Sequence, residues 1–316
     1  MGWSLGTNDA ANAFGTAVAT RVVKYRTAVT IIAVMIILGA ALLLFCLYLF
    51  LMRTRRAHEK IAAYRGVNFA HRGLHGEGAA ENSMTAFRRA KEAGFGVELD
   101  VRLSKDGELV VFHDDTLTRV AGVEGRVDEL TLAELRECRL SGTDDTIPTL
   151  REVFDLIDGS IPILIEIKEK IGSSAVTRKL LAELKSYDGP YIVESFDPMA
   201  ISAFRKGRRE VPLGILSRRF CDLEQHKGSP LYFALQNMLF NFLSVPDFVA
   251  YRHSDANTLS LKLARSLFGT VTVAWTTRSA EEGEAAKKNG FDCIIFENYL
   301  PEDGRADVSK LPKFVN

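Results

Sequence analysis

Short apolar runs alternate with amphipathic stretches along most of this chain, and that alternation restricts its possible folds more than any other feature. Such a rhythm is typical of βα units that build a parallel sheet. The predicted strands are Val67–His71, Gly96–Arg102, Pro162–Lys168, Tyr191–Phe196, Leu213–Ser217, Phe248–His253, Val271–Thr276 and Cys293–Glu297. Eight units over about 240 residues match an α/β fold of the TIM type, a (β/α)8 barrel, better than an open sheet.

Helix-start and helix-stop residues lie between the predicted strands. Asn82 and Ser83 precede MTAFRRAKEAG, and Asp197 with Pro198 precedes MAISAFRKG. Asn, Ser and Asp side chains cap helix N-termini, and proline fits the first turn. Gly94 is placed to end the first of these helices in a left-handed conformation.

Two stretches interrupt the alternation. The first, 104–146, is predicted to form a small insertion after the second strand, with a hairpin that returns as LVVFHD and a short helix from Thr131. The second, 220–247, contains LYFALQNMLFNFL, which is long and apolar for a loop. Burial preferences favour a core-packed helix there, and a lipid-facing element is the alternative.

The run from Ala28 to Met52 contains no charged residue. About 20 apolar residues span the hydrocarbon core of a bilayer, and the apolar region of a signal peptide is shorter, so a single transmembrane helix is predicted at 28–52. Basic residues flank it on both sides, in greater number after it (Arg53, Arg55, Arg56, Lys60) than before it (Arg21, Lys24, Arg26). The difference favours a cytoplasmic catalytic domain.

Composition excludes some classes of partner. Forty Lys and Arg residues balance forty Asp and Glu residues, so no overall positive field favours nucleic acid. The four cysteines are widely separated and lack metal-type spacing, which predicts free thiols. Nothing in the composition defines an oligomeric state.

Acidic residues interrupt two of the most apolar predicted strands. Glu98 and Asp100 in VELDVR point the same way, as do Glu166 and Lys168 in LIEIK, because strand side chains alternate. In a barrel these positions face the interior near the carboxyl ends of the strands, where active sites form. Three carboxylates so close together require a cation, and Ca²⁺ or Mg²⁺ prefers oxygen ligands. The alternative is that each is the ion-pair partner of Lys168 or an arginine.

Two histidines lie near the same predicted rim. His71 and Arg72 end the first strand, and His113 ends the hairpin strand. Because histidine titrates near neutral pH, one imidazole can accept a proton from a nucleophile while the other protonates a leaving group. Arg72 and Lys168 could hold the oxygens of a phosphate.

These motifs resemble those of the glycerophosphodiester phosphodiesterase family. The matching segments are FAHRG at 69–73, ENS at 81–83, VELDVR at 97–102, VFHD at 111–114, IPTLREVF at 147–154 and LIEIK at 164–168, with weaker matches in VESF at 193–196 and VAWT at 273–276. The resemblance covers residues 66–298. The last strand departs from it, ending in FEN at 296–298 where the family shows an aspartate-containing turn.

The resemblance implies a barrel that hydrolyses a glycerophosphodiester to an alcohol and glycerol 3-phosphate, by attack of the substrate's own hydroxyl and opening of a cyclic phosphate. The residue roles that it implies are the following: His71 and His113 are acid and base, Glu98, Asp100 and Glu166 bind a divalent metal, and Arg72 and Lys168 contact phosphate. Glu81 and Asn82 would support the metal site. Trp275 would pack against the glycerol or leaving group, or serve barrel-top packing.

A second resemblance precedes the membrane helix. Residues 2–34, and GTNDAANAFGTAVATRVVKYRTA at 6–28 in particular, look like the opening of inorganic phosphate transporters, where an Asn-Asp pair in a broken helix helps to bind phosphate. A transporter needs many spans, and one clear span is present, so this piece is not expected to transport alone.

The predicted organisation has five parts: a transporter-like segment at 1–27, the membrane helix at 28–52, a basic linker at 53–65, the barrel at 66–305 and a tail at 306–316. The predicted function is a membrane-anchored, metal-dependent phosphodiesterase. Two alternatives stay open, a lysophospholipase D-like enzyme that acts on membrane lipids and a noncatalytic membrane-anchored binding protein.

Overall fold

The computed structural model describes residues 12, 15–20, 24–56, 59–170 and 173–314. The chain divides into two compact units, Met1–Phe50 and Leu51–Asn316. The strands are β1 Asn68–Ala70, β2 Gly96–Leu103, β3 Leu109–Val111, β4 Ile163–Ile167, β5 Tyr191–Ser195, β6 Leu213–Ser217, β7 Phe248–Arg252, β8 Val271–Thr277 and β9 Cys293–Phe296. The α-helices are α2 Tyr25–Met52, α3 Glu59–Ala62, α4 Met84–Ala93, α5 Thr118–Ala121, α6 Leu132–Arg136, α7 Leu150–Ile157, α8 Ala175–Glu183, α9 Pro198–Gly207, α10 Pro230–Gln236, α11 Asn241–Ser244, α12 Leu259–Phe268 and α13 Ala280–Lys288.

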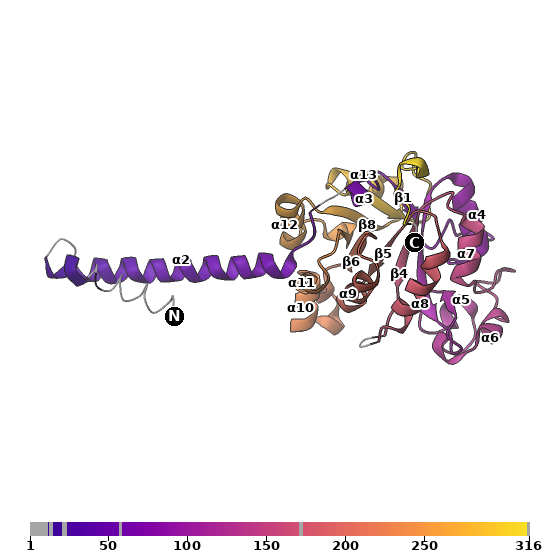
Figure 1. The fold of residues 1–316 in the computed structure, drawn as a ribbon, viewed down its shortest axis with the longest axis horizontal. Helices are drawn as coiled ribbons and strands as arrows, with labels where there is room; N and C mark the ends of the chain where they lie inside the picture. The colour runs from indigo at the N-terminus through magenta and orange to yellow at the C-terminus, as the bar shows by residue number, and fades with distance from the viewer. Residues whose placement is uncertain (1–11, 13–14, 21–23, 57–58, 171–172, 315–316) are drawn as a thin grey trace. The chain divides into compact units, whose positions relative to one another are not determined.

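The second unit is a closed barrel (Figure 1). Its strands follow the order β1-β9-β8-β7-β6-β5-β4-β2, and a further β1–β2 pairing closes the ring. All of these pairs are parallel, while β3 pairs antiparallel with β2 outside the ring. The predicted TIM-type fold is therefore confirmed, with the hairpin strand as an addition to it.

The residues predicted to cap helices do so in the structure. The Ser83 side chain accepts from the Ala86 amide at the start of α4, and Gly94 ends the helix with a φ of 77°. Asp197 caps α9, with a proline in its first turn. These caps satisfy orphan amides at points where the chain leaves one strand and must turn back toward the next.

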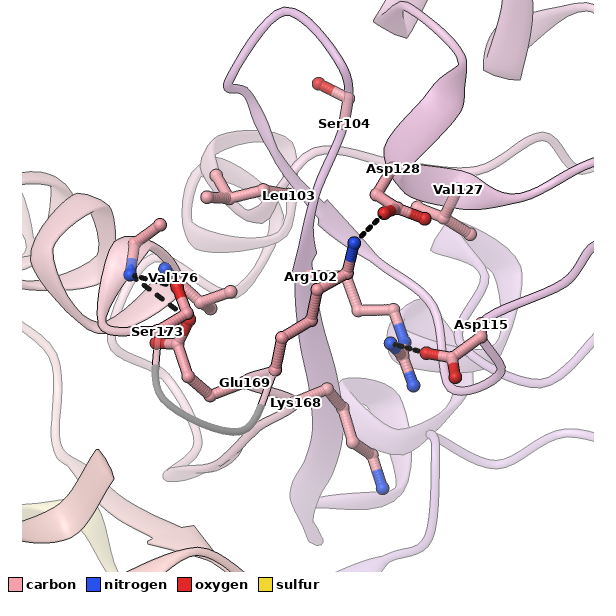
Figure 2. A pocket seen from close by; sticks show the side chains of 12 residues that line it. Arg102, Leu103, Ser104, Asp115, Val127, Asp128, Lys168, Glu169, Ser173 and Val176 are labelled. Atoms are coloured by element: carbon pink, nitrogen blue, oxygen red, sulfur yellow. Dashed lines mark hydrogen bonds and ion pairs between the residues drawn. The ribbon is translucent and has the colours of Figure 1, made fainter. Parts of the chain in front are cut away.

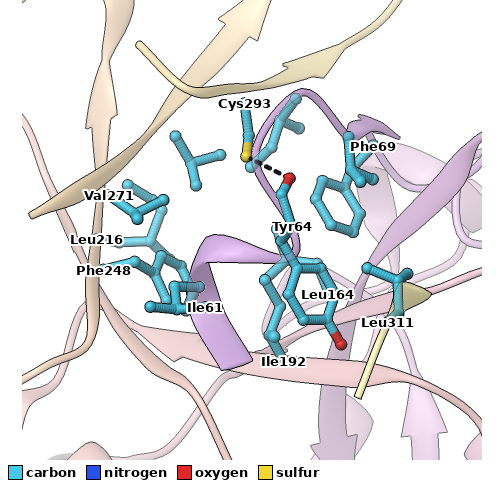
Figure 3. Close-up of a cluster of buried hydrophobic side chains, with 14 residues drawn as sticks. Ile61, Tyr64, Phe69, Leu164, Ile192, Leu216, Phe248, Val271, Cys293 and Leu311 are labelled. Carbon is cyan, nitrogen blue, oxygen red and sulfur yellow. Dashed lines mark hydrogen bonds between the residues drawn. The ribbon is translucent and has the colours of Figure 1, made fainter. Parts of the chain in front are cut away.

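Apolar side chains fill the barrel near the starts of the strands (Figure 3). Phe69, Leu164 and Phe248 lie in this cluster and are fully buried. Ile61 and Tyr64, which precede β1, join them, and the Tyr64 hydroxyl donates to the carbonyl of Tyr191. Each such side chain contributes about 1.5–3 kcal/mol by leaving water. The opposite end of the barrel is thus left for polar groups.

The insertion after β2 has a small apolar cluster of its own, which includes Phe112, Leu117 and Leu135. Thr131 begins α6 with a reciprocal capping arrangement that involves Glu134. The short helix predicted from Thr131 is therefore present. This packing holds the segment that carries His113.

The second insertion departs from the sequence prediction. The expected core-packed helix is wrong for α10, which buries none of its residues and exposes 53% of Leu231 and 55% of Phe233. The chain turns at Met238, whose φ is 58°, and continues in the short helix α11. Two short helices present no continuous apolar face long enough to enter the core.

The helix α2, 28 residues long, is the one helix among the described residues that is long and apolar enough to cross a membrane. A signal sequence near an N-terminus satisfies the same criteria. The predicted transporter-like segment at 1–27 lies largely outside the described residues. It stays a prediction, as do the predicted domain limits.

Candidate active site

Three predicted metal ligands lie together inside the barrel. Glu98 and Asp100 project from β2 and Glu166 from β4, where Asp100 and Glu166 are register partners. All three are buried, and one carboxylate oxygen of each lies within 4.8 Å of the others. The alternation of VELDVR and LIEIK therefore does bring these groups to one place.

Two cations contact this carboxylate group. The Lys168 Nζ lies 2.6 Å from Glu166 Oε1 and 3.1 Å from Asp100 Oδ1. The Arg72 Nε lies 3.4 Å from Asp100 Oδ2. The two residues predicted to contact phosphate thus lie beside the predicted metal ligands.

Burial and neighbouring charges shift the pKa values of the three carboxylates in different directions. Burial, with the nearby Asp100, raises the pKa of Glu98 well above its usual range. Burial also raises the pKa of Glu166 to about 7, despite Lys168. Burial acts in the same direction on Asp100, but Lys168, His113 and Arg72 together lower its pKa. In the absence of a further cation, Glu98 and Glu166 are therefore protonated more readily than Asp100.

A fourth buried carboxylate belongs to this region. Glu194 on β5 is the register partner of Glu166, and 1% of the residue is exposed. Its Oε2 has no hydrogen-bond partner among the described residues. Burial, Glu166 and Glu98 raise its pKa. The sequence signal was present in VESF, where one acidic residue interrupts an apolar strand, but the prediction did not use it.

The donor set fits a divalent cation. Glu98, Asp100, Glu166 and Glu194 offer four buried carboxylates, whereas two cations, Arg72 and Lys168, form ion pairs with Asp100 and Glu166. Two negative charges are in excess when all are ionised. A hard dication with oxygen ligands matches this excess and the chemistry of the donors.

His71 is held by a carboxylate directly after the last strand. Its Nδ1 lies 2.5 Å from the Oε2 of Glu297, which follows β9. Burial lowers the pKa of His71, while the bond to Glu297 opposes that shift. The Arg278 Nε lies 2.6 Å from the other oxygen of Glu297. His71, His75 and Glu297 also form a compact group, but its one carboxylate is already paired with Arg278 and His71.

His113 is held in the same manner, by its neighbour. Its Nδ1 lies 2.6 Å from Asp114 Oδ1, and Arg119 Nε lies 2.6 Å from Asp114 Oδ2. Burial lowers the pKa of His113, and Lys168 and Arg72 act in the same direction against Asp100. Both imidazoles thus use Nδ1 for a carboxylate, which leaves Nε2 for other partners.

Glu81 links the two halves of the site. It accepts from Arg72 Nη1 at 2.6 Å and from Arg119 Nη1 and Nη2 at 2.8 and 2.7 Å. A continuous chain of charge-assisted bonds therefore joins Arg72, Glu81, Arg119 and Asp114. Glu81 contacts the arginines beside the carboxylates, and its predicted role in supporting the metal site stays a prediction.

The backbone at Arg72 and Asn82 is left-handed, with φ values of 55° and 54°. In this conformation the Arg72 amide donates to Glu98 Oε2 at 3.0 Å. The Asn82 Nδ2 donates to Asp100 Oδ2 at 2.9 Å. Strained backbone at both positions therefore aims a donor at the carboxylates.

Trp275 lies on β8 and packs edge-to-face against Phe196, with ring centroids 5.6 Å apart. The Lys168 Nζ lies 6.0 Å from the centre of the same Phe196 ring. The buried Nε1 of Trp275 has no hydrogen-bond partner among the described residues. An aromatic pair therefore borders the cationic side of the site.

Two cavities meet at Lys168 and Glu169, which line both. The first, about 240 Å³, has charged walls that include Arg102, Asp115 and Asp128 (Figure 2). The second is an apolar groove of about 460 Å³. Its lining residues are Glu166, Ile167, Lys168, Glu169, Ser195, Phe196, Asp197, Pro198, Met199, Leu231, Leu235, Phe240 and Leu243.

A closed parallel barrel with acidic, basic and imidazole groups at the carboxyl ends of its strands is the arrangement of a TIM-barrel enzyme. Residues 71–299 match the glycerophosphoryl diester phosphodiesterase family. The chain belongs to this family.

Individual proteins are similar to this chain in sequence or in fold. A glycerophosphodiester phosphodiesterase of Caldanaerobacter subterraneus subsp. tengcongensis is 32% identical over 247 residues, covering 72% of this chain and 93% of its own. Human lysophospholipase D GDPD1 is 33% identical over 138 residues, 40% of this chain and 43% of its own. The solved structure of an Oleispira antarctica phosphodiesterase with the product sn-glycerol-3-phosphate has a TM-score of 0.63 at 23% identity, covering 74% of this chain and 94% of that one.

Proposed function

We propose that this chain hydrolyses glycerophosphodiesters to an alcohol and glycerol 3-phosphate with a divalent cation and two histidines. The observation that carries the proposal is the pairing of each imidazole Nδ1 with a carboxylate, in a site that also contains Glu98, Asp100 and Glu166. The same pairing argues against a noncatalytic binding role, because binding alone does not require two oriented imidazoles.

The chain's own residues supply proton transfer and phosphate binding. With Nδ1–H donated to Glu297 or Asp114, each neutral imidazole has an Nε2 lone pair. One imidazole accepts the proton of the attacking glycerol hydroxyl, and the other, as imidazolium, protonates the leaving alkoxide. Water then opens the resulting cyclic phosphate, with the proton-transfer roles of the two imidazoles reversed. Arg72 and Lys168 bind the non-bridging phosphate oxygens, where negative charge grows.

Glu98, Asp100 and Glu166 would hold the cation, and Glu194 lies next to them. Bound Ca²⁺ or Mg²⁺ would stabilise negative charge on the phosphoryl oxygens. We further propose that α2 anchors the enzyme in a membrane with the barrel on the cytoplasmic side, on the basis of helix length and flanking basic residues.

The test uses the full chain in nanodiscs with glycerophosphocholine, and glycerol 3-phosphate release is measured with Mg²⁺, with Ca²⁺ and in chelator. We expect turnover to require one of these cations. His71→Ala and His113→Ala should each lower kcat by about 10²–10⁴-fold. Glu98→Gln should weaken cation binding in calorimetry. No turnover with any divalent cation, or full turnover in chelator, contradicts the proposal.

A further inference from the structure

The apolar groove opens directly from the proposed phosphate site. Glu166 and Lys168, which lie in the site, also form one end of the groove. Phe196 lines the groove and contacts both Lys168 and Trp275. A ligand whose phosphate is bound at Lys168 can therefore place an adjoining part in the groove.

Part of the groove lining comes from the second insertion. Leu231 and Leu235 of α10 and Phe240 and Leu243 beyond it line the groove, together with residues at the start of α9. Glycerophosphocholine and similar water-soluble diesters have no apolar part for such a wall. A groove of about 460 Å³ is within the range of small-molecule sites, roughly 300–1,000 Å³.

The edge of the groove is exposed and apolar. Met199, Leu231 and Leu243 all line the groove, yet they remain 59%, 53% and 40% exposed. Phe233 on the same helix is 55% exposed. Exposed apolar residues gathered at one opening indicate contact with an apolar partner.

The insertion also lies where the chain enters the barrel unit. Within that unit, Asn241 Nδ2 donates to the carbonyl of Met52 at 3.3 Å, and the Arg55 amide donates to the carbonyl of Pro246 at 2.8 Å. Arg55 also lies 3.2 Å from Asp247. The second insertion, between Asn241 and Asp247, is therefore in contact with residues 52–55 of the same unit.

We propose that the groove binds the single acyl chain of a lysophospholipid whose phosphodiester is cleaved at the site. The inference rests on the proposed hydrolysis and narrows its substrate class. Phosphate bound at Lys168 and Arg72 fixes the position of the glycerol, and the acyl chain extends along Phe196 toward Leu231. The charged cavity that shares Lys168 and Glu169 then remains for the polar alcohol.

The test compares glycerophosphocholine with lysophosphatidylcholines of stepwise longer acyl chain, using the full chain in nanodiscs. Leu231→Gln/Leu243→Gln makes the groove edge polar. Leu267→Gln is the matched control, because Leu267 on α12 is also 53% exposed. Partition of the substrate into the nanodisc is the same for all variants, so differences between them report the groove.

We expect kcat/KM of the wild type and of Leu267→Gln to rise about two- to fourfold for each added methylene that enters the groove. The double variant should lose most of this dependence and should retain glycerophosphocholine turnover. An unchanged chain-length dependence in the double variant overturns the inference, as does equal loss on both substrates. If the wild type cleaves glycerophosphocholine but no lysophospholipid, the inference about the groove is wrong and the proposed hydrolysis stands. A wild type that cleaves neither overturns the proposed function as well.

Discussion

The carboxylate of Glu297 contacts His71 at Nδ1. Replacing this carboxylate tests whether it orients the imidazole and sets its pKa. Glu297→Gln keeps a hydrogen-bond acceptor near Nδ1 but removes the negative charge, so we expect kcat to fall by about 10–100-fold. Because Glu297 raises the pKa of His71 against the larger effect of burial, that pKa should fall further. The limb of the pH–rate profile that reports His71 should therefore move to lower pH.

The exposed Glu302, which lies beyond the same strand, provides the control. Glu302→Gln should leave both kcat and the pH profile unchanged. If Glu297→Gln lowered only thermal stability and left the pH profile in place, the carboxylate would have a structural role and the assignment to His71 would be wrong.

The raised pKa of Glu166 makes stability depend on pH when no cation is bound. The carboxyl has a folded pKa of about 7 and an unfolded pKa of about 4.5, so the folded state binds more protons between these values. Stability is thus fully present below about pH 4.5 and declines as pH rises through about 7, by about 3 kcal/mol at most. The melting temperature in chelator should fall over this window by on the order of 5–10 °C.

Glu166→Gln should make that decline shallower, because one of the three buried carboxyls with a raised pKa no longer ionises, whereas Glu92→Gln at an exposed position should leave it unchanged. Saturating Ca²⁺ or Mg²⁺ should raise the melting temperature most at the upper end of the window, where the carboxyl is ionised. Asp100 acts in a separate range, since its lowered pKa makes stability fall only at more acidic pH. A decline as steep in Glu166→Gln as in the wild type would contradict the assignment.

The site residues that lie in one local motif could be predicted from the sequence. Those that meet only through strand pairing or a folded insertion could not. Glu98, Asp100 and Glu166 follow from alternation within single strands, so their convergence could be predicted. Glu297 meets His71 only because the last strand pairs with the first across the closure of the barrel. The link from Glu81 to Arg119 spans 38 positions and forms through a folded insertion, which no local pattern encodes.

At the level of elements, strands were easier to predict than the segments between them. Parallel strands buried on both sides are continuous apolar runs, and all eight predicted ones are present. The segment LYFALQNMLFNFL has the same apolar composition, but its chain turn at Met238 gives two short helices around a groove. Composition alone does not distinguish an apolar core helix from the apolar wall of a binding site.

Ile61 and Tyr64, which precede the barrel strands, are a second case in which the sequence pattern does not show where side chains pack. They follow a basic stretch and have no strand period, which is why the sequence indicates a linker. In the fold they are 1% and 0% exposed and pack among the interior residues near the starts of the strands. A barrel end left open would expose Phe69 and Leu164 to water, and these two side chains cover it.

At the scale of the whole molecule, a chain that begins at Leu51 should separate catalysis from anchoring. It keeps Ile61, Tyr64 and the bond from the Arg55 amide to Pro246, so we expect a folded, soluble barrel. Turnover of glycerophosphocholine should stay within about twofold of the full chain, because the site lies wholly within Leu51–Asn316. Hydrolysis of lysophospholipid in vesicles should fall on the order of 100-fold, because the membrane no longer supplies a high effective concentration.

A chain that begins at Val67 is the informative comparison. It lacks Ile61 and Tyr64, and each large side chain lost from the interior costs about 2–5 kcal/mol, which together approach the whole stability of a typical domain. Circular dichroism should show a folded protein for the Leu51 chain only, and sedimentation with vesicles should be a property of the full chain only. If the Leu51 chain still sedimented with vesicles, α2 would not be the anchor, and the exposed edge around Leu231 would be the next surface to test.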